Sequence, residues 1–228
     1  MGMNKGKLIV IDGTDGSGKA TQTEFLIERL KKEGLSVQTI SFPQYGQKSA
    51  GMVEEYLSGK YGTASQVGPK PSSIFYAVDR FDASFKIKKW LESGQTVVSD
   101  RYVGSNMGHQ GSKISDPDER MKFYEWNMNL EHELFGIPKP DLNVVLHVPA
   151  EISFKLAQDR GGWKADIKTD IHETDINHLK DSVQAYLDIT NRFDMFKLVK
   201  CVENEKLLTR EEIHNRVWEL VSPLIKRI

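Results

Sequence analysis

The sequence contains little cysteine and no long apolar run. Cys201 is the single cysteine among 228 residues, which excludes an intramolecular disulfide and a metal site built from several cysteines. Such low cysteine use suits a reducing compartment, so we expect the protein to be cytoplasmic. No window approaches the ~20 consecutive apolar residues that a membrane-spanning helix needs, so we expect no membrane partner.

An excess of charge of either sign is also missing. The 31 Lys and Arg residues nearly balance the 32 Asp and Glu residues, and the formal net charge is -1 at pH 7. General nucleic-acid binders carry a basic surface, so this class is disfavoured. Charged residues make up 28% and hydrophobic residues 39%, which is typical of a folded globular chain. Without a repeat or a linker, we expect residues 1–228 to form a single domain.

What the chain does have is a regular alternation of β-branched runs and amphipathic segments. This alternation predicts an α/β fold in three layers, with a five-stranded parallel sheet flanked by helices. The expected strands are 8–11, 37–42, 96–99, 142–148 and 196–202, and the expected helices are 21–33, 52–57, 73–91, 117–135, 150–159, 175–193 and one opening at Thr209.

A glycine-rich loop lies between the first expected strand and the first expected helix. From Gly13 to Lys19 it matches Gly-x-x-x-x-Gly-Lys, and its place between strand and helix is that of a P-loop. The glycines let the loop curl so that backbone N–H groups point at phosphate oxygens, and Lys19 adds a positive charge. We expect this P-loop to bind ATP through Gly13, Asp15, Gly16, Ser17, Gly18, Lys19, Ala20 and Thr21.

One position of the loop departs from the usual pattern. Ala20 stands where a Ser or Thr normally offers a hydroxyl group to Mg²⁺. Thr21 follows immediately and is the candidate substitute for that hydroxyl. Alternatively, carboxylates such as Asp100 hold the metal together with water.

Charged side chains follow the ends of two expected strands. A carboxylate beside a polyphosphate, as at Asp15, is costly unless it serves a metal, an arginine or a substrate hydroxyl; alternatively Asp15 only braces a turn. Arg101 comes directly after the third strand, and in an open parallel sheet the strand carboxyl ends face the ligand crevice. Arg101 is therefore expected to bind phosphate with two hydrogen bonds, or else to close the turn through Asp100.

A highly charged segment covers roughly residues 159–173. It contains Arg160, Lys164 and Lys168 among acidic residues and glycines. Phosphoryl transfer needs positive charge around the moving group and exclusion of water, and a loop that closes over the phosphates supplies both. We expect a mobile lid here, with a merely solvated loop as the alternative.

Further segments accompany the P-loop in a fixed order. They are Asp-Gly-x-Gly-Lys-x-Thr at 15–21, Phe-Pro-x-Tyr-Gly at 42–46, Ala-Val-Asp-Arg at 77–80, Asp-Arg-Tyr at 100–102, Ser105 with Gln-Gly at 110–111, and Pro-Lys-Pro-Asp at 138–141. In this combination, which spans nearly the whole chain, the sequence resembles the thymidylate (dTMP) kinases of the P-loop nucleoside monophosphate kinase group. The resemblance implies ATP- and Mg²⁺-dependent phosphorylation of dTMP to dTDP, in dTTP biosynthesis, by a homodimer.

The resemblance also implies how the base of the nucleotide is bound. Tyr76 takes the place of an aromatic residue that stacks on thymine, and aromatic faces stack on any base. Arg80 takes the place of an arginine that reads the base edge or the substrate phosphate side. Asn106 and Gln110 take the places of residues that contact the pyrimidine. Alternatively, Tyr76 is plain core and Arg80 pairs on the helix surface with a neighbouring aspartate.

For the phosphate and sugar, the resemblance implies a second group of contacts. Tyr45 and Arg101 take the places of residues that hold the monophosphate, and Asp15 that of a carboxylate near the 3′-hydroxyl or the metal. Glu173 lies near the acidic residue at the end of the family's lid, which adds it to Thr21, Asp15 and Asp100 as a metal candidate. His109 stands where a tyrosine usually crowds the sugar 2′ position, so it is expected beside the sugar.

The implied chemistry is in-line transfer of the γ-phosphoryl group of ATP to a phosphate oxygen. That acceptor is already anionic at pH 7, so catalysis depends on positioning and charge neutralisation. The alternatives are a kinase for another pyrimidine monophosphate or for a deoxynucleoside, a P-loop ligase, which the loop length disfavours, and a nucleotide-binding module without turnover. The expected catalytic residues are Lys19, Arg101, Arg160 and Asp15.

Overall fold

The computed structural model describes residues 5–159 and 176–225. Nearly all of the predicted lid, including Arg160 and Glu173, lies outside the described residues. No helix of the described ranges is both long and apolar enough to cross a membrane.

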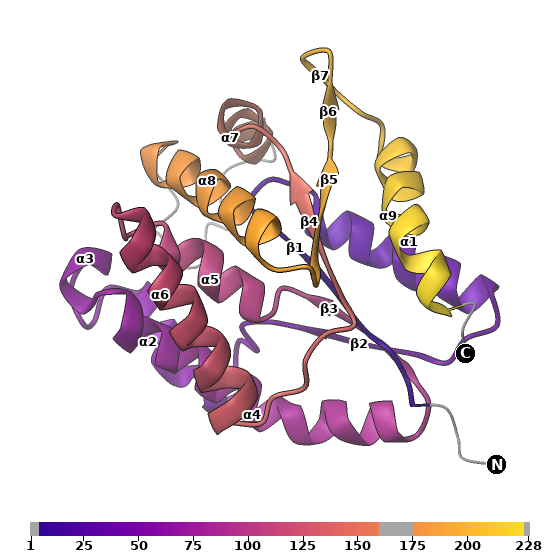
Figure 1. Ribbon diagram of the computed structural model, residues 1–228, viewed down its shortest axis with the longest axis horizontal. Helices are drawn as coiled ribbons and strands as arrows, with labels where there is room; N and C mark the ends of the chain where they lie inside the picture. Colours follow the sequence, from indigo (N-terminus) through magenta and orange to yellow (C-terminus); the bar gives the residue numbers. More distant parts are fainter. Residues whose placement is uncertain (1–4, 160–175, 226–228) are drawn as a thin grey trace.

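Five parallel strands form the central sheet, in the order β2-β3-β1-β4-β5 (Figure 1). In β1, Ile11 lies beside Asp100 of β3, so the carboxyl ends of these two neighbouring strands meet at one edge of the sheet. The predicted five-stranded parallel sheet is confirmed. The strands are β1 (Leu8–Gly13), β2 (Val37–Ser41), β3 (Thr96–Asp100), β4 (Leu142–His147) and β5 (Phe196–Lys200), and a separate hairpin pairs β6 (Val202–Glu203) with β7 (Lys206–Leu207).

Alternating side chains of β1 belong to two different cores, because successive strand residues point to opposite faces of the sheet. Leu8 and Val10 lie in one core and Ile9 and Ile11 in the other. Helices cover both faces, so the molecule has three layers (Figure 1). One face carries α1 (Lys19–Lys32) and α9 (Arg210–Ile225), and the other carries α4 (Pro69–Glu92), α5 (Val103–Gly111), α6 (Pro117–Met128) and α8 (Ile176–Arg192).

Short helices lie between these elements. Two of them match expectation: α2 (Gly51–Leu57) and α7 (Ala150–Asp159). The expected helix at 117–135 ends as an α-helix at Met128 and continues as a π-helix, η2 (Asn129–Leu134). A 3₁₀ helix, η1 (Lys48–Ala50), and the short α3 (Ala64–Val67) were not predicted.

One helix boundary was predicted wrongly and one helix was missed. Helix α4 begins at Pro69 rather than Ser73, because proline is tolerated in the first turn of a helix, where its missing N–H has no partner to lose. Helix α5 was not predicted at all, since its glycines lower helix propensity. Close packing explains these glycines: a Cβ at Gly108 would lie 2.7 Å from the ring of Tyr186, and one at Gly111 2.5 Å from that of Tyr124.

Candidate functional site

The P-loop joins β1 to α1 in a conformation that its glycines permit. Gly16 has a φ of 79°, and a Cβ there would lie 2.5 Å from the backbone oxygen of Ser153. The hydroxyl groups of Thr14 and Ser17 are buried, and neither has a hydrogen-bond partner in the described ranges. Buried polar atoms are rarely left unpaired, so this loop offers unused donors to a ligand. The helix that follows adds its N-terminal N–H groups.

Lys19 folds back across the loop. Its Nζ donates a hydrogen bond to the backbone oxygen of Thr14 at 2.9 Å and lies 3.5 Å from Oδ1 of Asp15. Burial and the nearby positive charge of Arg101 lower the pKa of Lys19 to about 8. The lysine is therefore held at the loop as a buried cation that an incoming polyphosphate would stabilise.

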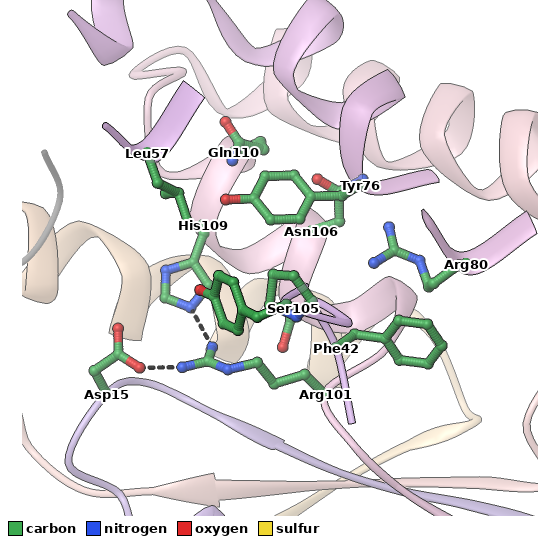
Figure 2. Close-up of a pocket in the computed structure, with 12 residues that line it drawn as sticks. Asp15, Phe42, Leu57, Tyr76, Arg80, Arg101, Ser105, Asn106, His109 and Gln110 are labelled. Carbon is green, nitrogen blue, oxygen red and sulfur yellow. Dashed lines mark hydrogen bonds and ion pairs between the residues drawn. The ribbon is translucent and has the colours of Figure 1, made fainter. Parts of the chain in front are cut away.

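Arg101 lies between the P-loop and helix α5. Its Nη2 pairs with Oδ1 of Asp15, and its Nη1 lies 3.1 Å from Nε2 of His109 (Figure 2). The alternative pairing within the turn, with Asp100, is not found among the described ion pairs. Arg101 has a positive φ of 65°, which non-glycine residues adopt mainly at special sites.

Opposing charges set the protonation of this group. Burial alone would raise the pKa of Asp15, but the charges of Arg101 and Lys19 outweigh it and hold that pKa far below its usual range. Burial and the charge of Arg101 lower the pKa of His109 well below 6.5. Asp15 is therefore ionised and His109 neutral at pH 7, so the imidazole accepts a hydrogen bond from Arg101 through Nε2.

A cavity of about 110 Å³ opens beside Arg101. It lies among α2, α4, α5 and the carboxyl ends of the central strands, and Phe42, Pro43, Leu57 and Ser105 form part of its wall (Figure 2). The structure brings all eight predicted substrate-contacting residues to this one cavity. They are Asp15, Tyr45, Tyr76, Arg80, Arg101, Asn106, His109 and Gln110.

Tyr76 and Arg80 enter the cavity from successive turns of α4. Tyr76 is half-buried, contacts Tyr56 edge to face and lies across the cavity, so it is not a plain core residue (Figure 2). The alternative interpretation, in which Arg80 pairs with a neighbouring aspartate on the helix surface, is wrong. Arg80 is 2% exposed, and its ion pair is not with Asp79 or another aspartate of α4. Its partner is Glu131, with Nε to Oε2 at 2.5 Å and Nη2 to Oε1 at 2.7 Å.

Sequence reasoning missed Glu131. Charged residues are frequent in this part of the expected helix 117–135, yet Glu131 is fully buried, and His132 is also buried and bonds the backbone oxygen of Ile137 through Nδ1 at 2.9 Å. The available signal was its spacing from Asn127, since residues four apart share a helix face. This spacing alone does not reveal that a buried arginine faces Asn127 and Glu131.

The polar atoms near Lys19 fit a magnesium ion that is held mainly by nucleotide phosphates. No cluster of three or more metal-ligating side chains exists within the described part of the chain. Oδ1 of Asp100 is buried and has no hydrogen-bond partner there, and Thr21 is half-buried in the first turn of α1. One carboxylate with phosphates and water is a usual Mg²⁺ set.

Known proteins match both the sequence and the fold. The thymidylate kinase family model matches residues 11–213. The chain is 32% identical to the thymidylate kinase of Mycobacterium tuberculosis over 169 residues, covering 74% of this chain and 78% of that protein. It is 31% identical to the probable thymidylate kinase of Thermococcus onnurineus over 227 residues, covering 96% and 99%.

A solved structure agrees at the level of the fold. The thymidylate kinase of Candida albicans superposes with a TM-score of 0.74 at 24% identity, covering 96% of this chain and 92% of that one. The family match extends over the P-loop, Arg101 and the cavity residues alike. The chain therefore belongs to the thymidylate kinase family.

Proposed function

We propose that this protein transfers the γ-phosphoryl group of ATP to dTMP, which yields ADP and dTDP. The observation that carries the proposal is the pairing of Asp15 with Arg101, which links the P-loop directly to the cavity lined by Tyr76 and Asn106. A donor phosphate at Lys19 and an acceptor phosphate at Arg101 would then face each other. We also propose that residues 1–228 form a single kinase domain.

The chemistry requires little from the protein beyond positioning and positive charge. An anionic oxygen of dTMP attacks the γ-phosphorus, and the bond from that phosphorus to the β,γ-bridging oxygen breaks, leaving ADP. No proton has to be removed, so no general base is needed. Lys19 and Arg101 supply fixed positive charge, while Asp15 keeps Arg101 in place. Arg160, outside the described residues, is proposed as a further cation.

The other cavity residues are proposed to hold the acceptor nucleotide. Tyr76 stacks on the base, while Asn106, Gln110 and Arg80 contact its polar edge. Tyr45 holds the acceptor phosphate with Arg101, and His109 lies beside the sugar. The wall of the cavity supports this assignment, because it combines the aromatic rings of Phe42, Tyr45 and Tyr76 with polar side chains.

Mg²⁺ is proposed as the cofactor, since bound Mg²⁺ neutralises charge on the β- and γ-phosphates. Asp100 and Thr21 are the proposed protein-side holders, supported by the unpartnered Oδ1 of Asp100. Asp15 is engaged by Arg101 and Lys19, so its proposed role is to position Arg101. Glu173 stays a prediction outside the described residues.

A cytoplasmic location is proposed from the single cysteine of the sequence. A homodimer is proposed from an apolar stripe on α4. Ile74, Val78, Phe81 and Phe85 are 40–56% exposed, and their spacing places them on one helix face. Sedimentation of Val78→Asp tests this: we expect monomers, whereas Leu207→Asp, an equally exposed apolar site on the distant β6-β7 hairpin, should stay dimeric (Figure 1). A wild-type monomer would contradict the dimer.

The test of the function is a coupled ADP-release assay with Mg²⁺-ATP and separate acceptors. We expect the highest kcat/KM with dTMP among dTMP, dUMP, dCMP, UMP and dGMP, and none with thymidine. Turnover of thymidine but not dTMP would instead indicate a deoxynucleoside kinase. ATP binding without transfer to any acceptor would indicate a binding module, and Lys19→Met controls for contaminating kinases.

A further inference from the structure

Glu131 is a fully buried carboxylate at the centre of a polar network beside the cavity. It lies in the π-helix η2, an irregularity that often marks functional sites. Its Oε1 accepts hydrogen bonds from three side chains: Arg80 at 2.7 Å, Asn106 at 3.1 Å and Asn127 at 3.2 Å. One carboxylate therefore holds two residues that line the cavity, Arg80 and Asn106.

The network fixes which way the Asn106 amide points. Its Nδ2 has three acceptors: the backbone oxygen of Ser73 at 3.2 Å, Oδ1 of Asn127 at 3.0 Å and Oε1 of Glu131 at 3.1 Å. A flipped amide would place its oxygen against these three oxygens, so this orientation alone is stable. Oδ1 of Asn106 is thereby left as an acceptor, and no donor reaches it from the described residues.

Two donor-bearing side chains, those of Gln110 and Arg80, line the same cavity and lie on either side of Asn106 in the view of Figure 2. Arg80 donates hydrogen bonds from Nε and Nη2 to Glu131, and its Nη1 has no acceptor in the part of the chain that the structure describes. Gln110 uses its Oε1 to accept from Ser72 at 2.7 Å and Lys113 at 2.5 Å. Its amide nitrogen is then turned toward the cavity, as Figure 2 shows.

This arrangement, an acceptor between two donors, is the complement of an imide edge. Thymine and uracil present such an edge, with a ring N–H between two carbonyl groups. Cytosine presents a ring nitrogen acceptor and an amino donor instead, so it would face Oδ1 of Asn106 with a lone pair and leave a buried polar group unpaired. Unpaired buried groups are the strongest source of discrimination between similar ligands.

We propose that Glu131 is a specificity-determining positioning residue. It turns Asn106 and Arg80 so that the cavity accepts an imide-type pyrimidine and rejects cytosine. The proposal rests on the proposed function, because it takes the cavity to be the site of the acceptor base. Glu131 acts through the two side chains that it holds and does not itself contact the nucleotide.

The direct test is Glu131→Gln, measured by calorimetry and by kcat/KM with dTMP and dCMP. Glutamine keeps the shape but replaces one acceptor oxygen by a donor, so the amide of Asn106 loses its fixed orientation. We expect the preference for dTMP over dCMP to fall at least about tenfold, as for loss of a hydrogen bond to a charged group. Glu133→Gln is the matched control, since Glu133 pairs only with Lys139 at the surface, and it should leave the preference unchanged.

A second variant covers the case in which Glu131→Gln does not fold. Asn127→Ala keeps the pair of Arg80 with Glu131 but removes one acceptor from Asn106, and we expect the preference to fall at least about threefold. Equal losses for dTMP and dCMP in the folded variants would assign Glu131 a purely structural role and overturn the proposal. Wild-type protein that neither binds nor phosphorylates dTMP would instead overturn the proposed function.

Discussion

Replacing Arg101 with alanine removes the group that joins the P-loop to the cavity. The structure gives its guanidinium two side-chain contacts, one with Asp15 and one with His109. Losing one preorganised donor to developing charge typically costs ~10²–10³-fold in kcat, about 2.7–4 kcal/mol of barrier. We therefore expect kcat to fall at least about 10²-fold in Arg101→Ala.

The fold should survive this substitution, which keeps the test interpretable. Asp15 keeps Lys19 at 3.5 Å, so its carboxylate is not left without a cation. We expect the free energy of unfolding to fall by only about 1–3 kcal/mol, the cost of a lost hydrogen-bonded partner. Thermal unfolding measures this loss separately from activity.

The assay is steady-state kinetics with both substrates varied, on wild type, Arg101→Ala and Arg101→Lys. Lysine keeps the charge but lacks the planar fork, so it cannot contact Asp15 and His109 together. We expect Arg101→Lys to lie between the other two, with the loss in kcat rather than in KM for ATP. An alanine variant whose kcat stays within threefold of wild type would remove Arg101 from the mechanism.

Three further predictions follow from packing, protonation and metal binding. Gly104→Ala would place a Cβ 2.6 Å from both Oδ2 of Asp12 and the ring of Phe196, so we expect a loss of about 1–3 kcal/mol in thermal unfolding. Gly51→Ala, in helix α2 with nothing within 4 Å, should instead be neutral or stabilise the fold by up to about 1 kcal/mol. If Gly104→Ala unfolds at the same temperature as Gly51→Ala, the packing described around Gly104 is contradicted. Burial holds the pKa of His109 below the ordinary 6.5, so the unfolded chain takes up a proton that the folded chain does not, and stability should fall as pH drops below 6.5. His109→Gln keeps an acceptor for Arg101 but does not titrate. With the free energy of unfolding measured by denaturant at several pH values below 6.5, we expect its dependence on pH to be shallower in this variant by about 1.4 kcal/mol per pH unit. An unchanged dependence on pH would show that His109 is protonated in the fold. Thr21→Val should raise the Mg²⁺ concentration needed for half-maximal rate at fixed ATP, while an unchanged requirement would leave Asp100 as the holder.

The sheet and the P-loop were accessible from sequence because each rests on local signals. The run from Leu8 to Ile11 is apolar and β-branched, and the glycines of the loop follow it at fixed spacing. Strand ends in a parallel sheet share one edge, so the sequence alone also predicts Arg101 at the crevice. These features depend on short stretches of chain and on general rules of α/β topology.

Helix α5 was not accessible in the same way. Its glycines at 104, 108 and 111 argue against a helix when read alone, and only the facing rings of Phe196, Tyr186 and Tyr124 explain them. Long-range packing therefore overrode local propensity. The positions of Asn106 and Gln110 came from family resemblance, and the helix that carries them came only from the structure.

Glu131 was missed for a related reason. A charged residue in a polar helix segment is usually solvated, and nothing local reveals that Arg80, 51 positions earlier, is buried against it. The ion pair exists because α4 and η2 pack against each other. A buried pair of this kind is a property of the tertiary fold and not of either segment.

The central claim is that the loop at Lys19 and the cavity at Tyr76 hold two nucleotides in one line. A crystal structure with dTMP and a non-hydrolysable ATP analogue tests this most directly. We predict the analogue's triphosphate in the P-loop, the thymine ring on Tyr76, and both reacting phosphates beside Arg101. Either nucleotide bound elsewhere, with the cavity or the loop vacant, would contradict the account.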